Sequence, residues 1–277
     1  MANEDQIEFW AEGTGTNWIK QEERIDAFFT PVDELLLNRA GDIAGKDLLD
    51  IGCGTGATSR AFRAADSVLS LDVSQRFLDA ATARAKAEGL DHLSYQLGDA
   101  QVTKVAPPRD MLISRFGVMF FDQPVVAFQN LRAGIKPGGS LTFACWAPFL
   151  ENPWFNAPFF IATELLGRPE PTDPRAPGPF AFSDVDYVTG ILTDAGWANV
   201  ACEVVNLDVP FPGTREDVTA FAREIGATPR LVRDMGGTAE DMDKIMAIYH
   251  EKLADFEVDG RVVMPLKLHF LTATNPA

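Results

Sequence analysis

A run of glycines followed at a distance by an acidic residue has the types and spacing of a nucleoside-binding site. Residues 48–59 read LLDIGCGTGATS, so that Gly52, Gly54 and Gly56 come directly after a short apolar run. Glycine tolerates positive φ and close approach by a ligand, and the helix expected behind the turn offers unpaired N–H groups at its start. Asp72 ends the next apolar run, where a doubly wound fold presents a carboxylate to ribose hydroxyls. Together these residues predict a site for a nucleoside cofactor.

Two classes of cofactor are compatible with this turn. Gly52, Gly54 and Ala57 satisfy the G-x-G-x-x-G/A pattern of dinucleotide enzymes, which leaves a nicotinamide cofactor open. Three features favour S-adenosylmethionine (SAM) instead. The first is Asp50, which lies two residues before the first glycine and can face the charged amino acid portion of that cofactor.

The other two features lie further along the predicted sheet. The segment Gly98-Asp99-Ala100 closes a third strand, predicted at 93–97, and adds an acid at the same sheet edge. Lys136-Pro137-Gly138-Gly139 is predicted to form a turn ahead of a fifth strand at 140–146.

Four elements in this order resemble the motifs of the class I SAM-dependent methyltransferases. LLDIGCGTG is similar to their first motif, LSLDVS to their second, LGDA to their third, and IKPGGSLTF to the turn before their fifth strand. The resemblance covers residues 46–146. The stretches SRFGVMFF and CWAP…NPW resemble the bacterial small-molecule branch related to the ubiquinone and menaquinone C-methyltransferases, from which the N-terminal region and the segment 216–257 differ.

This resemblance implies an α/β fold and a cofactor. The fold is a Rossmann-like, seven-stranded sheet with helices on both faces and an antiparallel last strand, plus a helical cap from insertions. The cofactor is SAM, and the resemblance assigns Asp99 to its adenine amino group, with Ala100 and Gln101 beside it. The candidate cofactor-binding residues are Asp50, Gly52, Cys53, Gly54, Gly56, Asp72, Val73, Asp99, Ala100, Gln101, Arg115, Trp18 and Gln21.

The exit of the predicted fourth strand, at 110–114, borders the same crevice because ligands of open α/β sheets bind outside the carboxyl ends of the strands. It reads SRFGVMFFDQP. The arginine of this stretch can form a salt bridge within the fold or contact the cofactor or substrate. Its large apolar residues can pack in the core or line a pocket. Candidate substrate contacts here and after the fifth strand are Phe116, Phe120, Trp146, Trp154 and Phe155.

Catalytic groups are sparse in this sequence. Methyl transfer from a sulfonium requires alignment and the exclusion of water, and a dedicated base is not obligatory. The catalytic residue is therefore unassigned, with Arg115, His250 on a predicted cap helix and His269 in the predicted last strand as candidates; a structural role is the alternative for each. The sequence has no H-x-x-x-H pair and no clear set of carboxylates, so no metal is expected.

The elements that must position these residues divide the chain into six segments. A proline-rich aromatic stretch and a second, helical stretch interrupt the core, and both are expected to roof a substrate cavity. In the first segment a Gly-Thr-Gly-Thr loop and a helix with Pro31 in its first turn are expected, and the resemblance favours a lid over an ordinary N-terminal cap. The segments are an N-terminal helical lid at 1–40, a SAM-binding core at 41–147, a cap insertion at 148–182, the core continued at 183–212, a helical cap insertion at 213–257 and the last core strand at 258–277.

Composition limits the partners. The net charge is −16, which argues against a nucleic-acid surface because phosphate contacts need clustered Lys and Arg. The three cysteines form no C-x-x-C pair, and no apolar run approaches the length of a membrane span. We therefore expect a cytoplasmic enzyme with a small-molecule substrate and no stable membrane insertion, and a homodimer stays open.

The sequence favours a SAM-dependent methyltransferase that acts on a small, partly apolar molecule and releases S-adenosylhomocysteine. Two alternatives use the same turn. One is a nicotinamide-dependent oxidoreductase, and the other is a non-catalytic SAM-binding protein, because no essential base is visible. The acceptor atom, carbon, nitrogen, oxygen or sulfur, is not specified.

Overall fold

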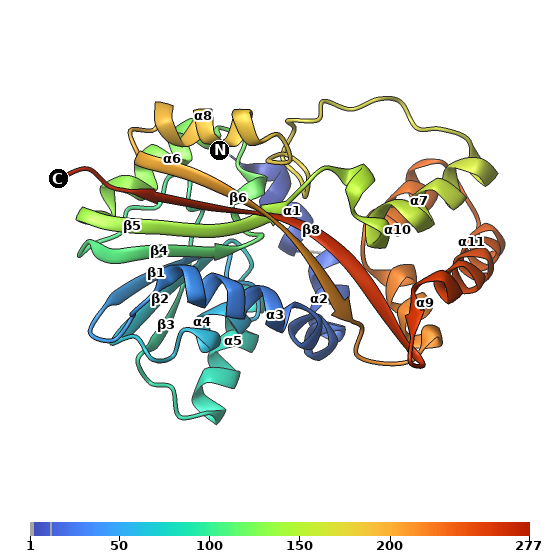
Figure 1. Cartoon of the computed structure of the whole chain (residues 1–277), viewed down its shortest axis with the longest axis horizontal. Coiled ribbons are helices and arrows are strands. Elements are labelled where there is room, and N and C mark those ends of the chain that lie inside the picture. Colours follow the sequence, from blue (N-terminus) through green and yellow to red (C-terminus); the bar gives the residue numbers. More distant parts are fainter. Residues whose placement is uncertain (1–2, 12) are drawn as a thin grey trace.

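The computed structural model describes residues 3–11 and 13–277, which form one mixed sheet flanked by helices and a helical cap (Figure 1). In the described residues the sheet has eight strands, seven of them in the order β3-β2-β1-β4-β5-β8-β6, while β7 pairs only with β8. The strands are β1 (Asp47–Ile51), β2 (Ser67–Asp72), β3 (Leu93–Leu97), β4 (Arg109–Arg115), β5 (Ile135–Trp146), β6 (Ala198–Pro210), β7 (Glu257–Val258) and β8 (Arg261–Thr274). This order confirms the predicted Rossmann-like class.

The strands from β3 to β5 are parallel, and β8 enters antiparallel between β5 and β6. Parallel strands are covered on both faces, which explains why apolar residues occupy the centres of β1 and β4. Leu48, Leu49, Leu112 and Ile113 are completely buried. The carboxyl ends of β1, β2 and β4 therefore meet at one edge of the sheet, on rigid supports.

Helices pack against both faces of this sheet (Figure 1). They are α3 (Glu22–Ala40), α4 (Ala57–Ala61), α5 (Gln75–Ala87), α6 (Pro124–Ala133) and α8 (Val185–Asp194), with the 3-10 turn η1 (Val118–Phe120) after β4. The predicted turn at 136–139 lies within β5 in the structure. Residues on both sides of it pair with β4: Ile135 pairs with Arg109, and Ser140 pairs with Met111.

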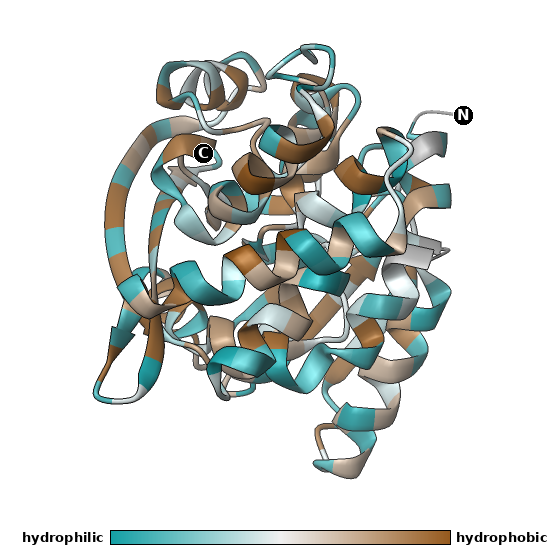
Figure 2. Cartoon of the chain, turned by 90° about the vertical axis from the view of Figure 1, so that its right-hand side faces the viewer, coloured by the Kyte–Doolittle hydropathy of each residue, from teal (hydrophilic) through white to brown (hydrophobic). Residues whose placement is uncertain are grey.

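The cap consists of helices from two insertions. They are η2 (Phe149–Glu151), α7 (Pro153–Leu166), α9 (Arg215–Glu224), α10 (Ala227–Asp234), α11 (Ala239–Lys252) and η3 (Leu253–Phe256). Capping boxes at Thr214/Asp217 and Thr238/Asp241 begin α9 and α11. The long strands β6 and β8 run from the sheet toward the cap in Figure 1, and the helices facing the viewer in Figure 2 alternate hydrophilic and hydrophobic residues.

The N-terminal helices depart from two sequence expectations. The predicted Gly-Thr-Gly-Thr loop lies in α2 (Gly13–Lys20), which packs on α1 (Glu4–Ala11). Glycine suits this contact, because a Cβ on Gly15 would lie 2.2 Å from the carbonyl oxygen of Trp10. Pro31 lies inside α3 rather than in a first turn. An interior proline costs about 3 kcal/mol, and burial of the apolar face that includes Phe28, Val32 and Leu36 offsets that cost.

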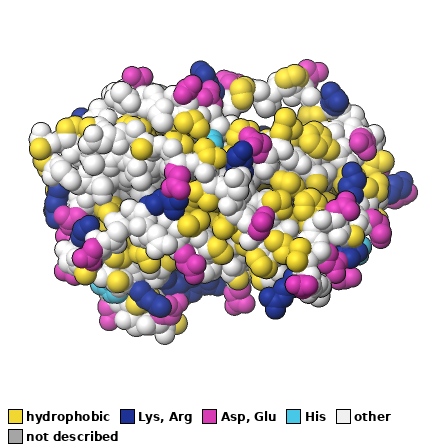
Figure 3. All heavy atoms as spheres, viewed as in Figure 1, with side chains coloured by type: hydrophobic (Ala, Val, Ile, Leu, Met, Phe, Trp, Pro, Cys, Tyr) yellow, Lys and Arg dark blue, Asp and Glu magenta, His cyan; other side chains and the backbone are white. Residues whose placement is uncertain are grey.

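Within the described residues, no helix combines the length and apolar character that crossing a membrane requires. On the face in Figure 3, hydrophobic side chains gather in the centre and the right half, among scattered charged groups.

Candidate functional site

The glycine turn after β1 touches the exit of β4. Gly52 has φ +64°, and a Cβ placed there would lie 2.6 Å from the Cα of Gly117. The two backbones meet so closely that neither position has room for a side chain. Gly56, with φ +80°, is the N-cap of α4. The turn is therefore shaped by contacts between main chains as well as by left-handed residues.

Asp72 joins this turn to the tip of β2. Its Oδ2 accepts a 2.8 Å hydrogen bond from the Gly54 amide, and its Oδ1 accepts one of 2.9 Å from the Ser74 amide. Burial raises the pKa of this carboxyl to about 6, against the lowering effect of those N–H groups. Asp72 lines the cavity described below, so it both holds the turn and faces a ligand space.

Asp99 lies in the wall of the same space and has one carboxylate oxygen without a hydrogen-bond partner in the described residues. One carboxylate oxygen accepts from the Gln101 amide at 2.9 Å, while Oδ2 is buried without a hydrogen-bond partner in the described structure. Burial raises the pKa of this carboxyl. Asp99 and Ala100 line the cavity. The side chain of Gln101 lies outside its lining and accepts from the Gln123 amide at 2.8 Å.

The structure places Asp50 away from the cavity wall. Its side chain is fully buried, and its Oδ2 accepts a 2.6 Å hydrogen bond from the Ser59 hydroxyl of α4, which also contacts Ser70. Neighbouring residues of a strand point to opposite faces, and Asp50 faces the helix layer rather than the open edge. Burial raises its pKa to about 7. Gly56 also lies outside the lining.

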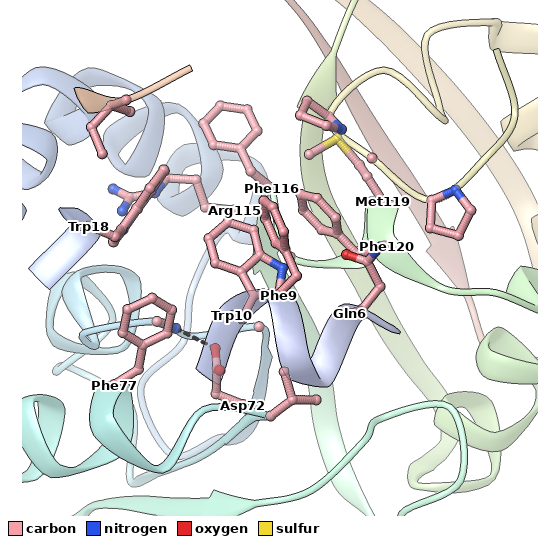
Figure 4. A pocket seen from close by; sticks show the side chains of 18 of the residues that line it. Gln6, Phe9, Trp10, Trp18, Asp72, Phe77, Arg115, Phe116, Met119 and Phe120 are labelled. Atoms are coloured by element: carbon pink, nitrogen blue, oxygen red, sulfur yellow. Dashed lines mark hydrogen bonds between the residues drawn. The ribbon is translucent and has the colours of Figure 1, made fainter. Parts of the chain in front are cut away.

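A single cavity of about 1000 Å³ extends from the glycine turn into the cap (Figure 4). At one end it is lined by Gly52, Cys53, Gly54, Asp72, Val73 and Asp99, and at the other by rings from β4, β5 and the cap, among them Phe116, Trp146, Trp154 and Phe155. Helices α1 and α2 lie over it, and in Figure 4 Phe9 and Trp10 of α1 lie between Asp72 and Phe116. Trp18 of α2 contacts Trp10 with ring centroids 5.8 Å apart.

Arg115 lies between the two ends of the cavity. It lines the wall, forms an ion pair with Asp33 and lies 4.0 Å from Asp26. The Thr58 hydroxyl donates to Asp33 at 2.7 Å. The Arg115 guanidinium lies 5.6 Å from the ring centroid of Phe29. The structural and functional interpretations of Arg115 are thus compatible, because it is paired within the fold and still borders the ligand space.

The aromatic end of the cavity is built around Phe116. This residue has φ +63°, a left-handed conformation that costs a side-chain residue of order 1–3 kcal/mol. Its ring stacks on Trp146, with centroids 4.6 Å apart and planes at 9°, and Phe155 meets Trp146 edge-on at 4.8 Å. Trp154 contacts Phe155 at 5.7 Å. Phe120 also lines the cavity, where it meets Trp10 edge-on at 5.3 Å.

Three other predicted site residues lie outside the cavity lining. Gln21 donates to Glu224 of α9 at 2.8 Å. His250 contacts the Thr219 hydroxyl at 3.2 Å, within the cap. His269 is buried on β8, where burial lowers its pKa and its Nδ1 has no hydrogen-bond partner in the part of the chain described. Neither histidine is placed to touch a ligand in this cavity.

The wall contains residues that sequence reasoning did not single out. They come from α1, α3, η2, α9 and α10. The sequence pattern could have indicated Asp26 and Phe29 of α3, because they flank the apolar helical face that Phe28 and Val32 define. The contributions of α1, α9 and α10 had none, since which helix faces the cavity depends on chain packing. These residues include Phe9, Trp10, Asp26, Phe29, Phe149, Phe221, Glu224, Arg230 and Arg233.

Within the described residues, no group of three or more His, Cys, Asp or Glu side chains is arranged to hold a metal ion. The polar groups on the cavity wall include carboxylates, Arg115, Arg230, Arg233 and the main chain of the turn.

Comparison with known proteins decides the family of the core. Residues 48–139 match the family model described as a methyltransferase domain. This segment belongs to the methyltransferase domain family. An uncharacterized protein of Mycobacterium tuberculosis is 33% identical over 166 residues, which is 59% of this chain and 58% of that protein. Nocamycin O-methyltransferase of Saccharothrix syringae is 30% identical over 190 residues, which is 62% of this chain and 66% of that protein. The chain thus matches little more than half the length of the mycobacterial relatives.

The solved structures show the same fold at low sequence identity. Phosphoethanolamine N-methyltransferase 2 of Haemonchus contortus, in complex with phosphomonomethylethanolamine and S-adenosylhomocysteine, has a TM-score of 0.55 and 18% identity. The alignment covers 89% of this chain and 53% of that one. Most of this chain therefore shares its fold with that structure.

Proposed function

We propose that this protein transfers a methyl group from SAM to a small, partly apolar molecule and releases S-adenosylhomocysteine. The observation that supports the proposal is the continuity of one cavity. It joins the glycine turn, Asp72 and Asp99 to an aromatic chamber beside Arg115 and Phe116. A nucleoside cofactor and an apolar acceptor would thus share one enclosure, as transfer between them requires.

The residues present fit the cofactor. The unpaired Oδ2 of Asp99 is a buried acceptor for an N–H donor such as the adenine amino group. Asp72 would accept from ribose hydroxyls, and the bare backbone at Gly52 and Gly54 would allow close approach. Asp50 lies outside the wall, so the charged amino acid portion would instead meet Arg115 and Asp26, which line the cavity as neighbours.

When bound, SAM supplies the activated methyl group on its sulfonium. The protein's own residues orient the acceptor and exclude water from the cavity. The stacked rings of Phe116 and Trp146, with Phe155, form an apolar wall that excludes water and orients a flat acceptor. These rings cannot take a proton, so this part of the wall supplies no general base. The relative named as an O-methyltransferase supports an oxygen acceptor.

We also propose that α1 and α2 act as a lid over this space. Lys20 and Gln21 bond Glu224 of α9 at 2.5 and 2.8 Å, and Arg24 bonds Asp217 at 2.8 Å. The N-terminal helices and the cap are thereby joined across the cavity. We keep as part of this proposal the domain divisions given above, with a lid at 1–40 and cap insertions at 148–182 and 213–257; the contacts of Lys20, Gln21 and Arg24 support them.

The direct test is to titrate the purified protein with SAM, S-adenosylhomocysteine and NADH by calorimetry, then to incubate it with methyl-labelled SAM and a panel of phenols, acids and amines. We expect binding of the first two nucleosides and label in one class of acceptor. Binding of NADH without SAM would favour the oxidoreductase alternative. Tight SAM binding without labelled product from any acceptor would favour the non-catalytic alternative.

A homodimer and a cytoplasmic location complete the proposal. Light scattering on the purified protein and fractionation of the producing cells test the two separately.

A further inference from the structure

We propose that the substrate carries an oxyanion, a carboxylate or phosphate, at the end remote from the methyl-accepting atom, and that Arg230 and Arg233 bind it. This inference rests on the proposed function, since it describes the second ligand of the same cavity. Both arginines belong to α10 and both line the cavity.

Their spacing brings the two cations together. Residues three apart on a helix are neighbours on one face, so the guanidinium groups of Arg230 and Arg233 project from the same side of α10. Their side chains are 68% and 70% exposed, which places them at the mouth rather than in the interior. The Arg230 guanidinium lies 6.0 Å from the ring centroid of Phe9 on α1, so it reaches the opposite rim.

The mouth differs in charge from the deeper wall. Asp26 is surrounded by Arg60 at 3.1 Å and Arg84 at 3.3 Å, with Arg115 at 4.0 Å, and Glu224 is bound by Lys20. These acids are balanced within the fold.

At the mouth, by contrast, both arginines pair with one carboxylate among the described side chains. Asp234 lies 3.3 Å from Arg230 and 3.5 Å from Arg233, through the Nε atom of each. Glu8 also lines the cavity. Guanidinium groups bind carboxylates and phosphates in a fork geometry, and two of them sharing one acid retain capacity for another anion.

The net charge of the whole molecule affects how an anionic substrate approaches these two arginines. A protein with net charge −16 repels anions at long range. A local cationic mouth would counter that repulsion within a Debye length of about 8 Å at physiological salt. The substrate that best matches the enclosure is thus an amphipathic acid, with its apolar ring system in the chamber around Phe116 and Trp146 and its anion between the two arginines.

The test compares matched ligands that differ only in charge. The probes are ω-(2-naphthyl)alkanoates with zero to four methylenes and the corresponding primary amides, and binding is followed by quenching of the tryptophans in the wall. We expect the acid to bind at least tenfold more tightly than the amide at one or more chain lengths. The double variant Arg230→Gln/Arg233→Gln should lose this preference while binding the amides as the wild type does, and added salt should weaken the preference.

The control variant is Arg223→Gln, an arginine of α9 that pairs with Asp243 and lies outside the cavity lining. It should keep the full preference for the acid. Equal binding of acid and amide at every length, binding of neither, or an undiminished preference in the double variant would overturn the proposal. Because no methyl transfer is measured here, a failure of the proposed activity is seen separately, in the SAM titration and the methyl-labelling assay of the same preparations.

Discussion

The Gly54 amide donates a 2.8 Å hydrogen bond to Oδ2 of Asp72, so the acid at the tip of β2 holds the turn that follows β1. The same carboxylate faces the cavity. Turn geometry and ligand contact thus depend on a single side chain, and substitutions at either partner should affect both.

Replacing Asp72 should weaken SAM binding. Asp72→Ala removes the proposed ribose contact and leaves the Gly54 and Ser74 amides unpaired, so we expect at least a tenfold loss of affinity, about 1.4 kcal/mol, by calorimetry. The matched control is Asp66→Ala, since Asp66 accepts from the Gly45 amide at the other end of β2. Unchanged affinity in Asp72→Ala would remove this residue from the cofactor site.

SAM affinity should depend on pH through the same group. The carboxyl of Asp72 has a pKa of about 6 because it is buried, and only its ionised form accepts freely from hydroxyl donors. Affinity should therefore rise as the pH increases from 5 to 7. In Asp72→Asn the rise should be reduced. An equally steep profile in that variant would assign the dependence to another group.

Asp50 should make the folded state less stable as the pH rises. Its pKa is raised from 3.8 to about 7 in the folded protein by burial, so folding takes up a proton between these values. Stability from this group is fully present below about pH 4 and is lost as the pH passes 7. Asp50→Asn keeps an acceptor for Ser59 and should flatten the fall in melting temperature between pH 5 and 7. Parallel melting curves for both proteins would contradict this assignment.

The close approach at the turn makes Gly52 intolerant of substitution. In Gly52→Ala the new Cβ would lie 2.6 Å from the Gly117 backbone, at φ +64°. We expect a loss of several kcal/mol in the free energy of unfolding, measured with urea, and a loss of SAM binding. Gly89→Ala is the matched control, because Gly89 has φ +69° but a Cβ added there would meet no atom within 4 Å. Its cost should be that of backbone strain alone, roughly 1–2 kcal/mol. Equal costs would show that the contact with Gly117 is unimportant.

Glu224 should hold the lid closed. Glu224→Gln weakens its contacts with Lys20 and Gln21, so we expect S-adenosylhomocysteine to dissociate about two to five times faster in stopped flow, consistent with the small energy of exposed ion pairs. Glu240→Gln provides the control, since Glu240 pairs with Lys244 within α11. The lid proposal fails if both variants release the ligand at the wild-type rate.

Local sequence patterns were enough for the core of the fold. The apolar runs that became β1, β2 and β4, the glycines between β1 and α4, and the acids at the ends of β2 and β3 are all short-range features. Each is recognisable because the physics that produces it acts within a few residues, through strand periodicity and left-handed glycine conformations. These features predicted the Rossmann-like sheet and the resemblance to methyltransferases that the comparisons confirm.

Elements whose form depends on partners were less predictable. The Gly-Thr-Gly-Thr segment is helical because α2 packs on α1, and Pro31 stays within α3 because the buried face of that helix continues past it. Propensity alone favours a loop and a helix start at these places, and long-range burial overrides it.

The direction of individual side chains was settled only by the tertiary structure. The sequence by itself determined the strand–turn–helix order and the carboxylates available at the sheet edge. It could not determine that Asp50 faces Ser59, that Gln21 reaches Glu224, or that Arg230 and Arg233 meet the same cavity as Asp99. Those relationships join residues as far apart in sequence as Gln21 and Glu224, which are separated by 203 positions, and they exist only because the packed chain brings their surfaces together.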